Sequence, residues 1–169
     1  MEHLLTTRVA TQADLAEIDA LLARSYPVLL KDHYAPSVLV TAIPHISKAQ
    51  PRLLTSGTYF VVLDDAGSIV GAGGWTKGAP GNGHAGPATT GHIRHVVTDH
   101  RCLRRGIGRA LMDRVFDTSR AAGITRLDCL STLMAVPFYA SNGFRELEPV
   151  SVSLAPGIDF PAVRMERRF

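Results

Sequence analysis

The part of this sequence that most constrains its fold is a strand that leads into a turn rich in glycine and arginine. The β-branched residues of His92–Thr98 indicate a strand, and Gly106 and Gly108 then open a segment with helical periodicity. Glycine lets the backbone approach a ligand closely, and the free N–H groups of a helix N-terminus attract an anion. The turn therefore predicts a site for a phosphate or pyrophosphate group.

The charge of the chain agrees with an anionic partner. The formal net charge is only +3, but four arginines fall within nine residues of this turn: Arg101, Arg104, Arg105 and Arg109. Arginine forms charge-assisted hydrogen bonds with phosphate oxygens. Such a cluster allows four interpretations: a phosphate-bearing cofactor, a nucleic acid, an acidic surface, and a merely solvated helix face.

The turn lacks the patterns of the common nucleotide-binding motifs. The sequence contains no G-x-x-x-x-G-K-[ST] segment, and the G-x-G at Gly106–Gly108 is not followed by the third glycine of a dinucleotide-binding fold. There is also no G-x-S-x-G elbow, so a serine hydrolase has no support.

Composition and length predict one domain covering residues 1–169. Hydrophobic residues make up 46% and charged residues 20% of the chain, which excludes intrinsic disorder. No apolar run approaches the ~20 residues that span a bilayer, and the first residues lack the pattern of a signal peptide. With only two cysteines, Cys102 and Cys129, we expect no disulfide framework and a cytoplasmic location, away from membranes.

Periodicity and turn residues predict a mixed α/β sheet that starts antiparallel and contains one βαβ crossover. The predicted helices are 15–24, Ser37–Ala49, Ile107–Ala122 and Ala135–Asn142, with loops at Tyr26–Pro36 and Thr76–Thr90. The predicted strands are Leu4–Val9, Thr58–Leu63, Ile69–Trp75, His92–Thr98, Thr125–Leu130, Val150–Leu154 and Ala162–Arg167.

Three segments, in order, resemble motifs of the GCN5-related N-acetyltransferase (GNAT) superfamily. Leu103–Gly108 (LRRGIG) is similar to the acetyl-CoA loop Q/R-x-x-G-x-G/A and departs from it at Leu103. Thr7–Leu15 resembles the opening strand and helix of the family, and Pro137–Phe144 (PFYASNGF) resembles its late FYxxxGF motif. The resemblance extends over nearly the whole chain.

The resemblance implies an α+β fold, a mostly antiparallel sheet with a central, splayed parallel pair flanked by helices. It also implies acetyl-CoA as cosubstrate, with its pantetheine arm inserted between the splayed strands. The family's asparagine before the late helix is replaced by Thr132, which alternatively only caps that helix. By position, the cofactor-binding residues are Val96, Val97, Thr98, Arg104, Arg105, Gly106, Ile107, Gly108, Arg109 and Thr132.

The catalytic roles that the resemblance implies fall on three residues. The Val96 N–H would hold the thioester oxyanion, and Tyr139 would protonate the departing thiolate. His92, fourteen residues before Gly106, would accept the proton of the amine, directly or through a water. The structural alternatives are core packing for Tyr139 and a hydrogen-bonded or surface role for His92. Alternation along a strand places His92 and Arg94 on one face and His95 on the other.

The implied function is an acetyl-CoA-dependent N-acetyltransferase that acts on a primary amine by direct attack within a ternary complex. Two alternatives stay open: a non-catalytic acyl-CoA-binding or sensory module, and a nucleic-acid-binding protein, which the lack of interleaved aromatic residues disfavours. The identity of the amine and a homodimeric state are open too. Candidate acceptor-site residues are Tyr26, His33, Tyr34 and Trp75, and no metal site is expected from His84, His92, His95 and His100.

Overall fold

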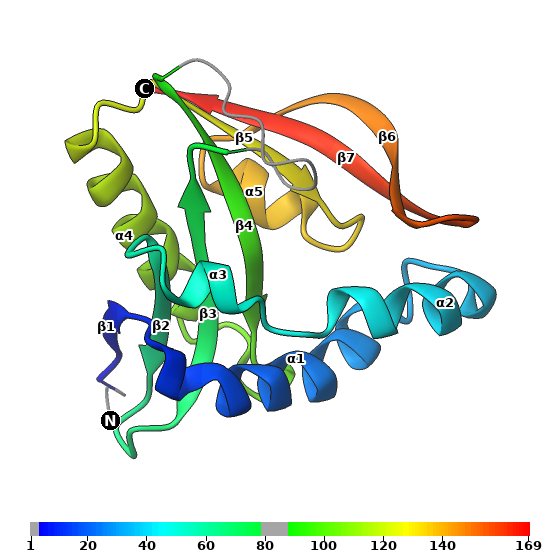
Figure 1. The fold of residues 1–169 in the computed structure, drawn as a ribbon, viewed down its shortest axis with the longest axis horizontal. Helices are drawn as coiled ribbons and strands as arrows, with labels where there is room; N and C mark the ends of the chain where they lie inside the picture. Colours follow the sequence, from blue (N-terminus) through cyan, green and yellow to red (C-terminus); the bar gives the residue numbers. More distant parts are fainter. Residues whose placement is uncertain (1–3, 79–87) are drawn as a thin grey trace.

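The computed structural model describes residues 4–78 and 88–169 of the chain (Figure 1). The strands are β1 (Thr6–Val9), β2 (Tyr59–Leu63), β3 (Ile69–Thr76), β4 (Thr90–Thr98), β5 (Arg126–Ser131), β6 (Arg145–Ala155) and β7 (Ile158–Arg168). The α-helices are α1 (Leu15–Leu30), α2 (Pro36–Ile46), α3 (Pro51–Leu54), α4 (Ile107–Ala121) and α5 (Val136–Ser141), and η1 (Gln12–Asp14) and η2 (His100–Cys102) are 3-10 turns.

Within the described residues the strands form one sheet in the order β1-β2-β3-β4-β5-β7-β6. Neighbouring strands are antiparallel except β4 and β5, which are parallel and joined by the crossover helix α4. This arrangement confirms the mixed sheet with a single βαβ crossover that the sequence predicts.

The parallel pair separates along its length. β4 and β5 pair only at Thr90–Arg126, Gly91–Leu127 and His92–Asp128, although β4 continues to Thr98 and β5 to Ser131. The second half of each strand therefore leaves its backbone groups without a partner across this gap, as the resemblance implies.

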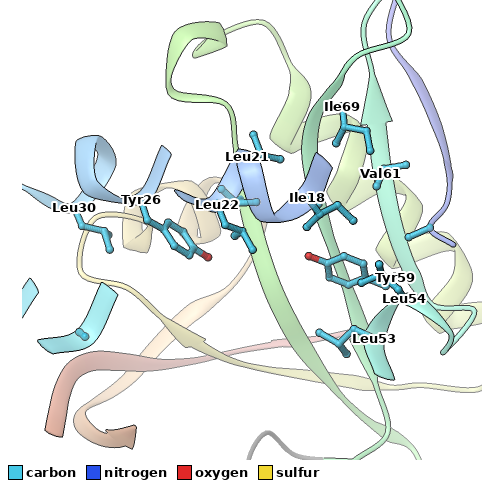
Figure 2. Packing of buried hydrophobic residues seen from close by; sticks show 14 of the residues in the cluster. Ile18, Leu21, Leu22, Tyr26, Leu30, Leu53, Leu54, Tyr59, Val61 and Ile69 are labelled. Carbon is cyan, nitrogen blue, oxygen red and sulfur yellow. The ribbon is translucent and has the colours of Figure 1, made fainter. Parts of the chain in front are cut away.

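Two apolar layers cover the two faces of the sheet. On one face α1 packs Ile18 and Leu21 against Val61, and Figure 2 shows this layer continuing to Tyr26 and Tyr59. On the other face lies α4, whose buried residues Leu111, Met112 and Val115 pack against Phe60 and Val62. Each fully buried side chain of this size contributes roughly 1.5–3 kcal/mol, so the two layers fix the position of β4 between them.

The predicted end of the first helix near Arg24 is wrong, and the predicted loop Tyr26–Pro36 is confirmed only for residues 31–35. α1 continues to Leu30 with Pro27 inside it. Proline removes one helical hydrogen bond, but burial at a spacing of four residues keeps the helix on the sheet. The buried residues that continue this face are Leu22, Tyr26 and Leu30.

The C-terminal segments form a hairpin that is longer than predicted. β6 and β7 pair from Arg145–Glu166 to Ala155–Ile158, and β7 inserts between β5 and β6. Most side chains of β6 are at least partly exposed, so the alternating pattern is weak towards its ends. In the part of the chain that the structure describes, no helix is long and apolar enough to cross a membrane.

Candidate active site

A cavity of about 780 Å³ lies where β4 and β5 separate. Its walls come from α1 to α3, from α5, from the β6–β7 hairpin and from the backbone and side chains of Ile93–Thr98 on β4. The cavity brings together four of the predicted cofactor-binding residues, Val96, Val97, Thr98 and Thr132, and Tyr139 also lines it, whereas residues 104–109 do not.

A bulge in β4 shapes the cavity wall. Gly74 of β3 pairs with Arg94 and Ala72 with Val97, so His95 and Val96 lie opposite the single residue Gly73. His95 adopts a φ of 49°, in the left-handed region that few non-glycine residues occupy. Such a bulge leaves one backbone unit of β4 outside the ladder, beside the gap between the parallel strands.

The bulge overturns the expectation that His95 faces away from Arg94. The Arg94 guanidinium donates to Gln50 Oε1 at 3.3 Å, and His95 Nε2 donates to the Ile46 carbonyl at 2.7 Å, so both side chains point towards α2 and α3. Alternation along a strand holds only where the ladder is regular, and the bulge resets it between these two residues.

Two buried tyrosines hold the backbone of the bulge. The Tyr59 hydroxyl donates to the His95 carbonyl at 2.9 Å, and the Tyr26 hydroxyl donates to the Val96 carbonyl at 3.2 Å. Burial raises the pKa of both phenols, so they remain donors at any ordinary pH. Tyr26 and Tyr59 come from opposite ends of the apolar layer in Figure 2 and fix two consecutive carbonyls of β4.

Tyr139 lies on α5 with its ring 5% exposed. It packs edge-on against Phe138 and Phe144, and its hydroxyl lies beside the Cys129 thiol of β5. Burial raises the pKa of Tyr139 well above its ordinary value, and the neighbouring thiol adds to the effect. The phenol therefore keeps its proton in the free protein, as a general acid must.

The glycine-arginine turn begins α4 as predicted. Arg104 has a φ of 64° and Gly106 a φ of 78°, and the first helical bond joins the Ala110 N–H to the Gly106 carbonyl. The amides of Ile107, Gly108 and Arg109 therefore precede the first helical bond and have no partner in the helix. Arg104, Arg105 and Arg109 are exposed, and within the described residues none of them forms an ion pair with a carboxylate. An anion can approach this turn directly.

Gly108 is required for a reason that the sequence does not reveal. A Cβ at this position would lie 2.6 Å from the Phe138 ring of α5, whereas a Cβ at Gly106 would meet nothing within 4 Å. The missing side chain at Gly108 thus makes room for an aromatic ring of the cavity wall. Gly106 instead permits the left-handed backbone of the turn.

Thr132 has both of the features considered for it. Its Oγ1 accepts a hydrogen bond from the Ala135 N–H at 3.3 Å, just before α5 begins. Thr132 also lines the cavity. Leu103, where the family motif usually has a polar residue, is exposed and lines the cavity as well.

His92 lies at the last paired position of the parallel strands, between Thr76 and Asp128. It is not among the residues that line the cavity, whereas Arg94 two positions further is. Its Nε2 is buried and has no hydrogen-bond partner among the described residues. Burial lowers the pKa of His92, although Asp128 opposes the shift, so the ring is neutral at neutral pH.

Of the four residues considered for the acceptor, only Tyr26 lines the cavity. His33 is exposed beyond α1, and the Tyr34 hydroxyl donates to the Pro161 carbonyl at 2.7 Å. Trp75 is buried on the α4 face, where its Nε1 donates to Thr118 Oγ1 at 2.9 Å. Trp75 and Tyr34 are therefore packing residues of the fold.

In the described ranges no group of three or more histidine, cysteine or acidic side chains is placed to hold a metal ion. His84, one of the histidines considered, lies outside the described residues. His92 and His95 contact different elements, and His95 Nε2 is already bonded to a carbonyl.

Asp99 is a structural residue of the site that sequence reasoning missed. It is fully buried directly after β4 and accepts hydrogen bonds from Arg24 of α1 at 3.0 Å and from the side chain and N–H of Arg101. These partners hold the pKa of Asp99 well below its usual range. An aspartate between a strand and an arginine-rich turn is a cap signal, and it could have indicated this contact.

A family model described as an acetyltransferase (GNAT) domain matches residues 32–167. Among curated protein sequences, no significant match was found.

Many solved structures share the fold. The chain is similar to a PaiA N-acetyltransferase from Thermoplasma acidophilum in complex with coenzyme A, with 13% identity, a TM-score of 0.72, and 98% of this chain and 99% of that chain covered. It is also similar to a GCN5-related N-acetyltransferase from Rhodopseudomonas palustris, at 21% identity and a TM-score of 0.75, covering 100% and 97%. A third similar structure is N-acetylglutamate synthase from Neisseria gonorrhoeae complexed with coenzyme A and N-acetyl-glutamate, at 20% identity and a TM-score of 0.62. The match covers 99% of this chain and 36% of that chain.

Proposed function

Because the chain belongs to the GNAT family of acetyltransferases, we propose that it transfers the acetyl group of acetyl-CoA to a primary amine by direct attack within a ternary complex. The observation that carries the proposal is the separation of β4 and β5 beyond His92. It leaves unpaired backbone of β4 beside one cavity, which Tyr139 and Leu103, just before the glycine-arginine turn, also line. The coenzyme A bound in two structures of the same fold supports the choice of donor.

For the donor, we assign the pantetheine arm to the gap between the parallel strands, where the backbone of Val97 and Thr98 can bind its amides. The pyrophosphate would lie on the amides of Gly106, Ile107, Gly108 and Arg109, with Arg104, Arg105 and Arg109 adding charge-assisted hydrogen bonds. Thr132, which directly follows β5 and lines the cavity, would contact the arm from that side.

For the chemistry, the amine nitrogen attacks the thioester carbon, and the Val96 N–H stabilises the negative charge that forms on the carbonyl oxygen. Preorganised backbone donors suit this role because they need no reorganisation during the reaction. The C–S bond then breaks, and the thiolate takes the proton of the Tyr139 hydroxyl. The anchored carbonyl of Val96 and the bulge beside it support this assignment.

For the proton of the amine, we propose His92 as the acceptor, acting through a water because His92 does not line the cavity. Its neutral ring and its unpartnered Nε2 support the role. His95 is the matched comparison: its Nε2 is bonded to the Ile46 carbonyl, and its buried Nδ1 also has no partner among the described residues.

Both cysteines are unpaired, Cys129 buried and Cys102 partly exposed. Free thiols support a reducing compartment, and we propose the cytoplasm as the location.

Calorimetric titration with acetyl-CoA, followed by a thiol-release assay with amines, tests the function. The wild-type protein should bind acetyl-CoA, and Arg109→Glu should weaken binding at least tenfold because it places a negative charge beside the pyrophosphate. Arg114→Glu, which changes an exposed arginine further along α4, is the matched control and should bind normally. Absence of binding in the wild type would overturn the function.

Tyr139→Phe separates an enzyme from an acyl-CoA-binding module of the same fold. Removal of the acid should lower kcat by about 10²–10⁴ and leave acetyl-CoA affinity unchanged, because the hydroxyl acts only as the C–S bond breaks. Binding without thiol release from any amine in the wild type would favour the non-catalytic module.

A further inference from the structure

The cavity contains basic groups but no acidic side chain among the described residues that line it. Its ionisable groups besides tyrosines are His45, Arg52, Arg94 and His95. Arg94 and His95 precede Val96 on β4 and so lie on its side away from the glycine-arginine turn, and Arg94 bonds Gln50, two residues before Arg52. A polycationic acceptor would find no counter-charge here.

Four arginines of the described residues are partly buried: Arg24, Arg94, Arg126 and Arg167. Arg24 and Arg126 each bond a carboxylate, from Asp99 and Asp128 respectively, and Arg167 donates to the Asn142 carbonyl and lies over the Phe116 ring. Arg94 donates only to neutral oxygens within the described residues, Thr76 Oγ1 at 3.0 Å and Gln50 Oε1 at 3.3 Å. These two contacts use one hydrogen of each terminal nitrogen.

The two contacts also fix the position of the guanidinium. Thr76 belongs to β3 and Gln50 precedes α3, so the group is held from two elements at the cavity wall. Burial without an anionic partner lowers the pKa of Arg94. A half-buried, oriented guanidinium with free donors is the group that binds a carboxylate by two parallel hydrogen bonds.

We propose that the acceptor is a small amine that also carries a carboxylate, and that Arg94 binds that carboxylate in the cavity. The inference rests on the proposed acetyl transfer. Arg94 lies two residues from Val96, so their Cα atoms are at most about 7 Å apart, which is within the reach of one amino acid. Arg52 adds a second positive charge at the same end.

The rest of the wall indicates the side chain of this amino acid. Leu53, Leu130, Met134, Val152 and Phe160 line the cavity, and all are apolar. We therefore infer an amino acid with an apolar side chain, because apolar walls favour apolar ligand surface.

The test compares matched acids and amides in the thiol-release assay. The probes are L-leucine, L-methionine and L-phenylalanine and their carboxamides, each with saturating acetyl-CoA. The wild type should use the acids with kcat/KM at least tenfold above that of the amides. The amine of a carboxamide loses its proton more easily, so a preference for the acid has to come from recognition.

Arg94→Gln keeps hydrogen-bonding capacity but removes the charge, and it should reduce the acid-to-amide ratio by about 10- to 100-fold, chiefly through KM. Arg94→Lys should have an acid-to-amide ratio between those of the wild type and Arg94→Gln, because it keeps the positive charge. Arg114→Gln, on the opposite face of the sheet, should leave it unchanged.

Equal or better use of the amides by the wild type would overturn the proposal, as would an unchanged ratio in Arg94→Gln. Thiol release from none of the six probes, with acetyl-CoA binding intact, would overturn it too and leave the donor site standing. If the wild type does not bind acetyl-CoA, this result would instead overturn the proposed function itself.

Discussion

Gly106 and Gly108 are two residues apart in one motif, and the structure requires them for different reasons. Gly106→Ala forces a left-handed backbone on a residue with a Cβ and should lower the free energy of unfolding by about 1–2 kcal/mol. Gly108→Ala places its Cβ against the Phe138 ring and should cost about 1–3 kcal/mol from overpacking.

Denaturant unfolding of both variants measures these costs, and calorimetry separates their effects on the site. Only Gly108→Ala should displace Phe138 and therefore reduce acetyl-CoA affinity markedly. Equal affinities for the two variants would show that α5 adjusts to the added methyl group.

The lowered pKa of His92 makes a prediction about pH. A base must be unprotonated, so kcat/KM should fall as the pH drops through the pKa of His92 in the free enzyme. Since burial lowers that pKa, the midpoint of the acidic limb should lie below about 6.5.

His92→Gln should remove this acidic limb and lower the rate most near neutral pH, where free amine is scarce. His95→Gln is the comparison variant. If only His95→Gln changes the profile, the proton acceptor is His95, and His92 is structural.

Residue motifs predicted Tyr139, Thr132 and the glycine-arginine turn because these features are local in sequence. They did not predict the position of His95. Its direction depends on a bulge that β3 and two distant tyrosines stabilise, and such contacts leave no pattern in the strand itself. The roles of the motif residues remain predictions for experiment.

At the scale of elements, Asp99 joins α1 to the turn that follows β4. Asp99→Asn should lower the free energy of unfolding by about 1–3 kcal/mol, because it replaces the buried carboxylate that accepts from Arg24 and Arg101 with a neutral amide, while both arginines keep access to solvent. It should also weaken acetyl-CoA binding, since Arg101 stands only three residues before Arg104.

The acid stability of the protein provides a second readout. The pKa of Asp99 is lowered, so its contribution is complete above the unfolded value of about 3.9 and is lost as the pH falls towards the folded value. Asp99→Asn should flatten the loss of stability below pH 4. An unchanged acid unfolding curve would show that other carboxylates dominate it.

Sequence patterns located most elements because these carry a local signal. In α4 the signal is the periodic spacing of buried residues, and in β2 it is the content of β-branched residues. The patterns failed where tertiary contact outweighs local signals. The sequence predicts a helix end near Arg24, yet α1 continues through Pro27 to the buried Leu30. The place of β7 between β5 and β6 also has no local signal, because it is a matter of pairing and not of strand propensity.

At the scale of the whole molecule, a donor bound across the gap contacts both halves of the sheet and should stabilise the fold. At 100 times its Kd, acetyl-CoA should add about 2.7 kcal/mol, which is a rise in Tm of roughly 5–10 °C for a protein of this size. Differential scanning calorimetry with and without acetyl-CoA measures the shift. Arg109→Glu should lose most of it and Arg114→Glu none.

The three residue pairs that join β4 to β5 have a mechanical consequence. The sheet consists of two parts, β1–β4 and β5–β7, whose strands pair directly at one end only, while at the other end Tyr34 connects them through Pro161 and Leu133. Amides of Cys129–Ser131 that face β4 have no strand partner there and should exchange with solvent faster than those that bond β7. Acetyl-CoA bound along the gap would connect the two parts of the sheet. The protein would therefore become more rigid when acetyl-CoA binds and more flexible again when CoA leaves.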